Sequence, residues 1–131
     1  MTQKERDLLL KDLCARLPYN PLVEYEGEDY NVLGIAHGRL VLCKPLMSHT
    51  LNENPRVEEI KPYLFSLKSM TNEQEKEFDQ LLELELKAIS DEIDHAQVTA
   101  FEIDFYNKHH FDWRGLIPMG LALDATGLNI Y

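Results

Sequence analysis

Hydrophobic residues recur at helical spacing near the start of the chain. Thr2 and Glu5 have the spacing of a capping box, which predicts a helix beginning there. The apolar side chains that follow fall on one helical face: Leu9, Leu10, Leu13, Cys14 and Leu17. Pro18 and Pro21 then end the helix, because proline lacks an amide donor and restricts the residue before it.

After this helix the hydrophobic residues occur in short runs without helical spacing, which predicts strands. Three short runs are rich in β-branched, aromatic and leucine residues: Leu22–Glu26, Tyr30–Ala36 and Arg39–Cys43. Gly27 and Gly38 separate the runs and supply the positive φ that tight hairpins need, so we expect an antiparallel meander. Residues 44–56 predict a loop, and Val57–Leu67 is compatible with a further strand or a turn of helix.

The strongest helical pattern lies in the second half of the chain. Thr71 and Gln74 form a second capping box, and the helix is expected to run from Asn72 to Asp94. Its apolar stripe consists of Phe78, Leu81, Leu82, Leu86, Ala88, Ile89 and Ile93. Thr99 with Glu102 predicts a third capping box and a shorter helix through His109.

The last third of the chain contains one segment of ambiguous secondary structure and an apolar C-terminal tail. Phe101, Ile103 and Phe105 alternate with acidic residues in a way that also suits a strand, although helix is favoured. Beyond them, a short helical turn should stop near Gly120 and lead into an extended segment. We expect the large apolar residues of this tail to pack on the Phe78–Ile93 stripe and the sheet, or on a second subunit. Residues 129–131 should be loosely held.

These elements predict one domain covering residues 1–131. The fold class is α+β: an N-terminal helix, a small antiparallel sheet of three to four strands, then one long and one shorter C-terminal helix. A composition of 44% hydrophobic and 27% charged residues is ordinary for a globular chain.

The charge balance narrows the classes of partner. The net charge is −10, which disfavours nucleic acid and anionic membrane surfaces as ligands. Between Thr71 and Asp104 there are 11 acidic and two basic residues, so this stretch alone carries −9. A solvated helix face explains these acids most simply. An acidic decoy that occupies a basic groove is the alternative.

Cysteine usage and the N-terminal segment favour a cytoplasmic protein. Cys14 and Cys43 are far apart, form no CxxC pair and make no disulfide framework, so both are expected to be free and buried. The charged N-terminus has no apolar run long enough for a signal peptide or a membrane span.

The densest polar cluster follows the third predicted helix. His109, His110 and Asp112 are weak candidates for catalysis, since histidines beside a carboxylate can hold a metal or exchange protons. Neighbouring helical residues diverge by about 100°, so the two histidines do not share one ion on a helix. The favoured interpretation is that they finish the helix and Asp112 caps the next turn. Trp113, largely buried, and Arg114 would form a packing corner.

Two acidic residues of the long helix are weak candidates for binding, together with Trp113 and Arg114. Glu85 falls inside the apolar stripe, and Glu92 lies one heptad later. An edge position, from which the carboxylate reaches water, is the favoured explanation for Glu85. The sequence predicts no metal and no cofactor.

One segment resembles known proteins. Lys61–Leu64, Ser69–Thr71 and above all His109–Ile117, followed by Gly120–Ala122, resemble short uncharacterised proteins encoded by prophages and mobile elements of Bacteroides-type bacteria. The resemblance covers the C-terminal half well and the N-terminal half only in layout. It implies a phage or mobile-element context and no particular activity.

The sequence therefore favours a small acidic non-enzymatic accessory protein. Its partner would be another protein, or a second copy of itself, rather than a small molecule. Two alternatives stay open. One is a metal-assisted hydrolase that uses the His109, His110 and Asp112 cluster, and the other is an acidic decoy of a basic nucleic-acid-binding protein.

Overall fold

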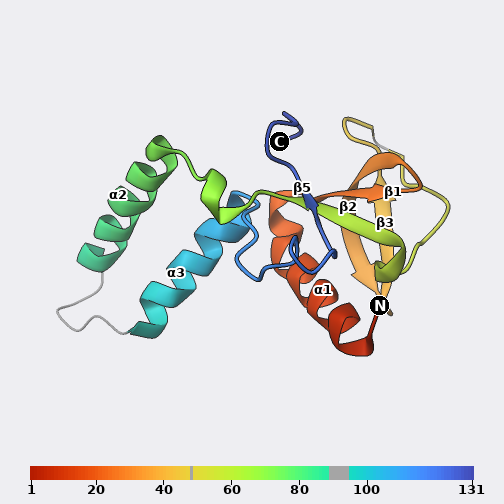
Figure 1. Ribbon diagram of the computed structural model, residues 1–131, viewed down its shortest axis with the longest axis horizontal. Coiled ribbons are helices and arrows are strands. Elements are labelled where there is room, and N and C mark those ends of the chain that lie inside the picture. Colours follow the sequence, from red (N-terminus) through yellow and green to blue (C-terminus); the bar gives the residue numbers. More distant parts are fainter. Residues whose placement is uncertain (48, 89–94) are drawn as a thin grey trace.

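A five-stranded sheet, one helix against it and a projecting pair of helices make up the molecule (Figure 1). The computed structural model describes residues 1–47, 49–88 and 95–131, without the side chains of 85–88 and 95–97. The α+β class is confirmed. Among the described residues, no helix is both long and apolar enough to cross a membrane.

Helix α1 (Gln3–Arg16) begins at the expected capping box. The amide of Glu5 donates to Oγ1 of Thr2 over 3.1 Å, and a 3₁₀ turn over Leu17–Tyr19 follows the helix. Its buried face differs from the expected one, because it comprises Leu9, Asp12, Leu13 and Arg16. Cys14 is exposed, so the prediction that both thiols are buried is wrong for this residue.

The sheet begins with the expected meander. Strands β1 (Leu22–Tyr25), β2 (Glu28–Ala36) and β3 (Arg39–Cys43) pair antiparallel in succession. After the loop, a 3₁₀ turn over Val57–Glu59 leads directly into β4 (Ile60–Leu64), so both structures considered for this stretch occur in sequence.

The last strand changes the character of the sheet. Strand β5 (Leu123–Asp124) pairs parallel with β4, and the strand order is β3-β2-β1-β4-β5. The expected antiparallel sheet of three to four strands is therefore a mixed sheet of five. The connection from β4 to β5 passes through two helices, which allows parallel strands to pair. An isolated parallel bridge between Phe65 and Phe111 lies just beyond β4.

Helices α2 (Asn72–Ala88) and α3 (His95–Lys108) run antiparallel and project from the sheet (Figure 1). The capping box of α2 is present, since the amide of Gln74 donates to Oγ1 of Thr71. Residues 89–94 of the expected long helix lie outside the described residues. Helix α3 begins before Thr99, so Thr99 is an interior residue and not an N-cap, and the alternative strand does not form.

The core lies between α1, the sheet and the C-terminal tail. Leu116 and Leu121 pack with Leu9 and Leu13 of α1 and with the buried face of the sheet. A turn that ends at Gly120 (φ 77°) shapes the tail as expected. The expected packing of the tail on the sheet is confirmed, but its packing on the described part of the Phe78–Ile93 stripe is wrong. Among the described residues, neither buried cluster of the core includes a side chain of α2 or α3.

Candidate functional site

The polar cluster of the sequence lies at the end of α3. The amide of His110 donates to the carbonyl of Asn107 over 3.2 Å, and the amide of Phe111 donates to the carbonyl of Tyr106 over 2.8 Å. These two bonds form a Schellman motif, with His110 at its left-handed position (φ 62°). Glycine is the usual residue there, so the histidine is held in a conformation that side chains disfavour.

A stacking contact holds the His110 ring. It lies on the ring of Tyr131 with centroids 3.5 Å apart and an angle of 13° between the planes. The Nδ1 atom of His110 is buried, and the described residues offer it no hydrogen-bond partner. Burial, followed by the charges of Arg16 and His109, lowers the pKa of His110 to about 4. The ring is therefore neutral and structural at neutral pH.

His109 faces a different direction. Its ring lies 4.5 Å from the Phe105 centroid, and Nε2 lies 3.8 Å from a carboxylate oxygen of Glu77 on α2. Burial lowers the pKa of His109, although the charge of Glu77 opposes the shift. The ring therefore lies beside α2, at a distance longer than a hydrogen bond.

Asp112 caps the turn that follows, as the favoured interpretation expected. Its two carboxylate oxygens accept the amides of Leu116 at 2.7 Å and Ile117 at 2.9 Å. The structure thus brings His109, His110 and Asp112 into one corner but gives each a separate contact. In the described part of the chain, no group of three His, Cys, Asp or Glu residues is placed to hold a metal ion.

Sequence reasoning missed the charged pair that anchors this corner. Asp12 and Arg16 of α1 are both fully buried, and Nε of Arg16 donates to Asp12 over 2.9 Å. Arg16 also donates to the carbonyl of Phe111 over 2.6 Å, and Arg114 donates to Asp12 over 3.2 Å. The signal was present, because a carboxylate and a guanidinium four residues apart occupy the face that bears Leu9.

Trp113 and Arg114 do form a packing corner. The guanidinium carbon of Arg114 lies 4.0 Å from a ring centroid of Trp113, and the indole amine donates to Oδ1 of Asn107 over 2.9 Å. Trp113 is partly exposed, and most of its surface is buried, as expected. Its indole amine thus donates to a buried side chain, since Asn107 is itself buried.

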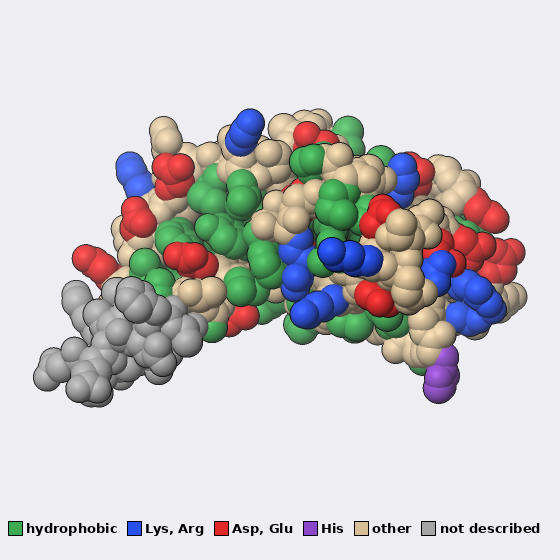
Figure 2. All heavy atoms as spheres, turned by 60° about the horizontal axis from the view of Figure 1, so that its bottom comes forward, with side chains coloured by type: hydrophobic (Ala, Val, Ile, Leu, Met, Phe, Trp, Pro, Cys, Tyr) green, Lys and Arg blue, Asp and Glu red, His purple; other side chains and the backbone are tan. Residues whose placement is uncertain are grey.

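The projecting helices expose apolar surface. Phe78 of α2 packs on the rings of Phe101, Phe105 and Tyr106 of α3, with centroids 5.0–6.3 Å apart. Most apolar side chains described on this hairpin are half-buried or exposed: Phe78, Leu81, Leu82, Leu84, Val98, Ala100, Phe101, Ile103 and Tyr106. Figure 2 shows hydrophobic side chains gathered over α2 and α3 with acidic side chains among and around them.

Glu85 and Glu92 are the two other weak candidates for binding. The side chain of Glu85 and the whole of Glu92 lie outside the described residues.

A comparison of the chain with models of protein families, with curated proteins and with solved structures finds no match. Function is therefore inferred from the surface of the hairpin and from the polar cluster at the end of α3.

Proposed function

We propose that the protein is a non-enzymatic interaction protein that binds a basic protein through the α2–α3 hairpin. The observation that carries this proposal is the incomplete burial of the hairpin's apolar stripe. One neighbouring helix covers only part of a stripe about 100° wide. Within the stripe, Phe78, Leu81 and Leu82 are only partly buried, and Leu84, which lies outside the stripe, is 63% exposed. Contiguous apolar surface of this kind is typical of a protein-binding site.

The negative charge of α2 favours a basic protein as the partner. The acidic residues described on α2 are all exposed: Glu73, Glu75, Glu77, Asp79 and Glu83. A second copy of the chain would bring equal charges together, and a nucleic acid would be repelled. A protein surface with apolar side chains flanked by lysine and arginine complements both the apolar surface and the negative charge of the hairpin.

The corner at the end of α3 supports a binding role over a catalytic one. The buried charged groups of this corner already hold backbone amides or carbonyls, as Asp112 does for Leu116 and Arg16 for Phe111. These contacts fix the base of the hairpin against α1 and the sheet. The geometry gives the metal-assisted hydrolase no support, because His109 and His110 face different partners.

The resemblance of the C-terminal half suggests the setting. In a prophage or mobile element, a basic host protein that acts on nucleic acid would be a suitable target, and the hairpin would act as its acidic decoy. We also infer a cytoplasmic location. The two cysteines are free, with Cys14 exposed on α1 and Cys43 buried in β3, which suits a reducing compartment.

Purification of partners from the native host tests the proposal, with binding then measured on the purified partner. We expect Leu84→Arg and Glu83→Lys each to weaken binding by at least about tenfold, equivalent to about 1.4 kcal/mol. Rising salt should also weaken binding by the wild type, because the acidic side chains of α2 are exposed and their charges are screened. Matched controls are Leu33→Arg on β2, where leucine is 55% exposed, and Glu26→Lys in the β1–β2 turn.

Other outcomes would contradict the proposal. Equal binding by the hairpin variants and the controls would place the interface elsewhere. Self-association through the hairpin, detected by ultracentrifugation and abolished by Leu84→Arg, would identify a second copy as the occupant. A measured turnover lost in His109→Ala with unchanged melting would restore the enzymatic alternative.

A further inference from the structure

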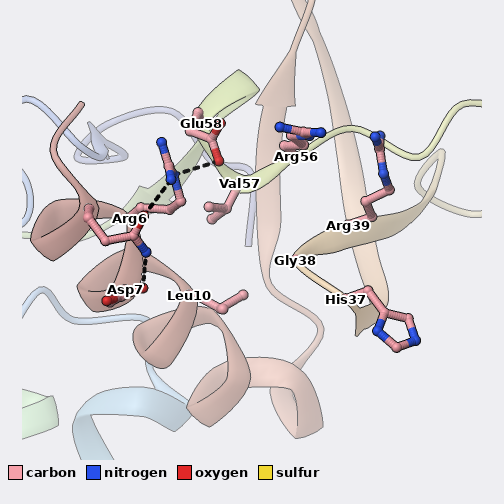
Figure 3. Close-up of a pocket in the computed structure, with 10 residues that line it drawn as sticks. Arg6, Asp7, Leu10, His37, Gly38, Arg39, Arg56, Val57 and Glu58 are labelled. Atoms are coloured by element: carbon pink, nitrogen blue, oxygen red, sulfur yellow. Dashed lines mark hydrogen bonds and ion pairs between the residues drawn. The ribbon is translucent and has the colours of Figure 1, made fainter.

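A second surface feature lies away from the hairpin, where the N-terminal half of α1 meets the β2–β3 turn. A cavity of about 280 Å³ opens between these elements and the 3₁₀ turn before β4. Its walls include Arg6, Arg39 and Arg56 (Figure 3). The chain has five arginines, so three of them line one small cavity of a protein whose net charge is −10.

Backbone geometry forces two of these arginines together. His37 (φ 54°) and Gly38 (φ 73°) form a two-residue turn with positive φ at both positions, which places Arg39 at the start of β3. Arg39 then pairs antiparallel with Arg56 in an isolated bridge, and the amide of Leu40 donates to the carbonyl of Pro55 over 2.8 Å. Like charges on directly opposed residues destabilise such a pair.

The carboxylates near the cavity are already engaged. Asp7, which lines the cavity, accepts the side-chain amide of Gln3 at 2.8 Å. Glu58 pairs with Nε of Arg6 at 2.9 Å, and Glu59 accepts the backbone amide of Arg56 at 2.7 Å. Arg39 donates to the carbonyl of Asn54 over 3.1 Å. Within the described residues, neither Arg39 nor Arg56 has an acidic partner for its guanidinium. The other arginines differ, because Arg16 and Arg114 share Asp12 and Arg6 has Glu58.

We propose that this cavity binds the phosphate group of a small phosphate monoester between Arg6, Arg39 and Arg56. Guanidinium groups match phosphate oxygens with paired hydrogen bonds, and the exposed Arg39 and Arg56 have free donors. Figure 3 shows these two side chains on one side of the pocket and the Arg6–Glu58 pair on the other. The volume suits a phosphate with a small attached group.

Calorimetric titration of the full chain with inorganic phosphate and with AMP, in sodium chloride of matched ionic strength, tests the site. We expect one site per chain, with Arg39→Gln and Arg56→Gln each weakening binding by at least about tenfold. Lys44→Gln is the matched control, because Lys44 pairs with Glu28 outside the cavity. Tighter binding of AMP than of phosphate would identify a nucleotide source, and equal binding would identify free phosphate.

Thermal melting without phosphate separates binding from a structural role. Removal of one of two unpaired guanidinium groups should leave the melting temperature unchanged or raise it. Equal binding of phosphate by the wild type and the Arg39→Gln, Arg56→Gln double variant would overturn the proposal. So would absence of binding to the wild type, or a lowered melting temperature in both single variants with unchanged phosphate affinity.

Discussion

The phenol of Tyr131 closes the corner that begins at His110. The Tyr131 ring stacks on that imidazole with centroids 3.5 Å apart. Its hydroxyl accepts the amide of Leu22 at 2.8 Å and donates to the carbonyl of Tyr63 over 3.1 Å. Burial of the hydroxyl raises the pKa of Tyr131 to about 12. The last residue therefore joins α3 to β1 and β4, and the expectation of a loosely held end is wrong for this side chain.

Truncation of this side chain should destabilise the fold in two steps. Tyr131→Phe keeps the stacked ring and loses the hydroxyl contacts, at a cost of about 1 kcal/mol. Tyr131→Ala also loses the stack, and the total should reach about 2–3 kcal/mol in urea unfolding. Leu128→Ala, at a residue 50% exposed, is the control and should change little. Identical unfolding curves for all three variants would contradict the joining role.

His110 should make stability depend on pH. Its folded pKa of about 4 lies below the ordinary value of 6.5, so the unfolded chain takes up the proton first as the pH falls. The stabilisation is complete above pH 6.5 and is lost between pH 6.5 and 4, by up to about 3 kcal/mol.

Urea unfolding across that pH range checks this expectation. His110→Asn, which tolerates the left-handed backbone, should flatten the profile. His109→Gln should keep most of the slope, although the lowered pKa of His109 contributes in the same direction. A slope unchanged in His110→Asn would assign the pH dependence to other groups.

Asp12 should be the most sensitive charged position. Asp12→Ala leaves the buried guanidinium of Arg16 without its carboxylate and should cost about 3–5 kcal/mol. The double variant Asp12→Ala, Arg16→Met should recover part of this loss, because an apolar side chain needs no partner there. Thermal melting measures both, with the exposed Asp7→Ala as the control. Equal melting of Asp12→Ala and Asp7→Ala would refute the anchoring role.

Phe111, not Trp113, should dominate the stability of the tail. Phe111 is 1% exposed and contacts Phe65 and Tyr106, so Phe111→Ala should cost about 3–5 kcal/mol. Trp113 is partly exposed, and Trp113→Ala should cost less, about 2–3 kcal/mol by the area it buries. Chemical unfolding of the two variants gives the order, and the reverse order would contradict the central position of Phe111 in the packing of the tail.

Local chemistry explains which parts of the fold could be predicted. The capping boxes at Thr2 and Thr71 and the turns at Gly27 and Gly38 depend only on nearby residues, and each is present. The two residues of β5 carry no pattern of their own. They form a strand because β4 offers a free edge, which depends on the whole chain.

The candidate site was harder to predict for the same reason. His109, His110 and Asp112 were found as a cluster, and their separate contacts became visible only with Glu77, Tyr131 and the turn after Asp112 in place. Asp12 and Arg16 were overlooked because charged residues are usually solvated. Their mutual pairing, together with the carbonyl of Phe111, makes burial possible.

The bridge between Phe65 and Phe111 gives the fold a modular construction. The amide of Phe65 donates to the carbonyl of His110, and the amide of Asp112 donates to the carbonyl of Phe65, each over 2.8 Å. The two ends of the intervening stretch therefore meet at the separation of neighbouring strands, about 4.8 Å. Evolution can lengthen, exchange or remove the hairpin at this junction while the sheet and α1 keep their own core. The hairpin and the rest of the fold are thus free to diverge at different rates.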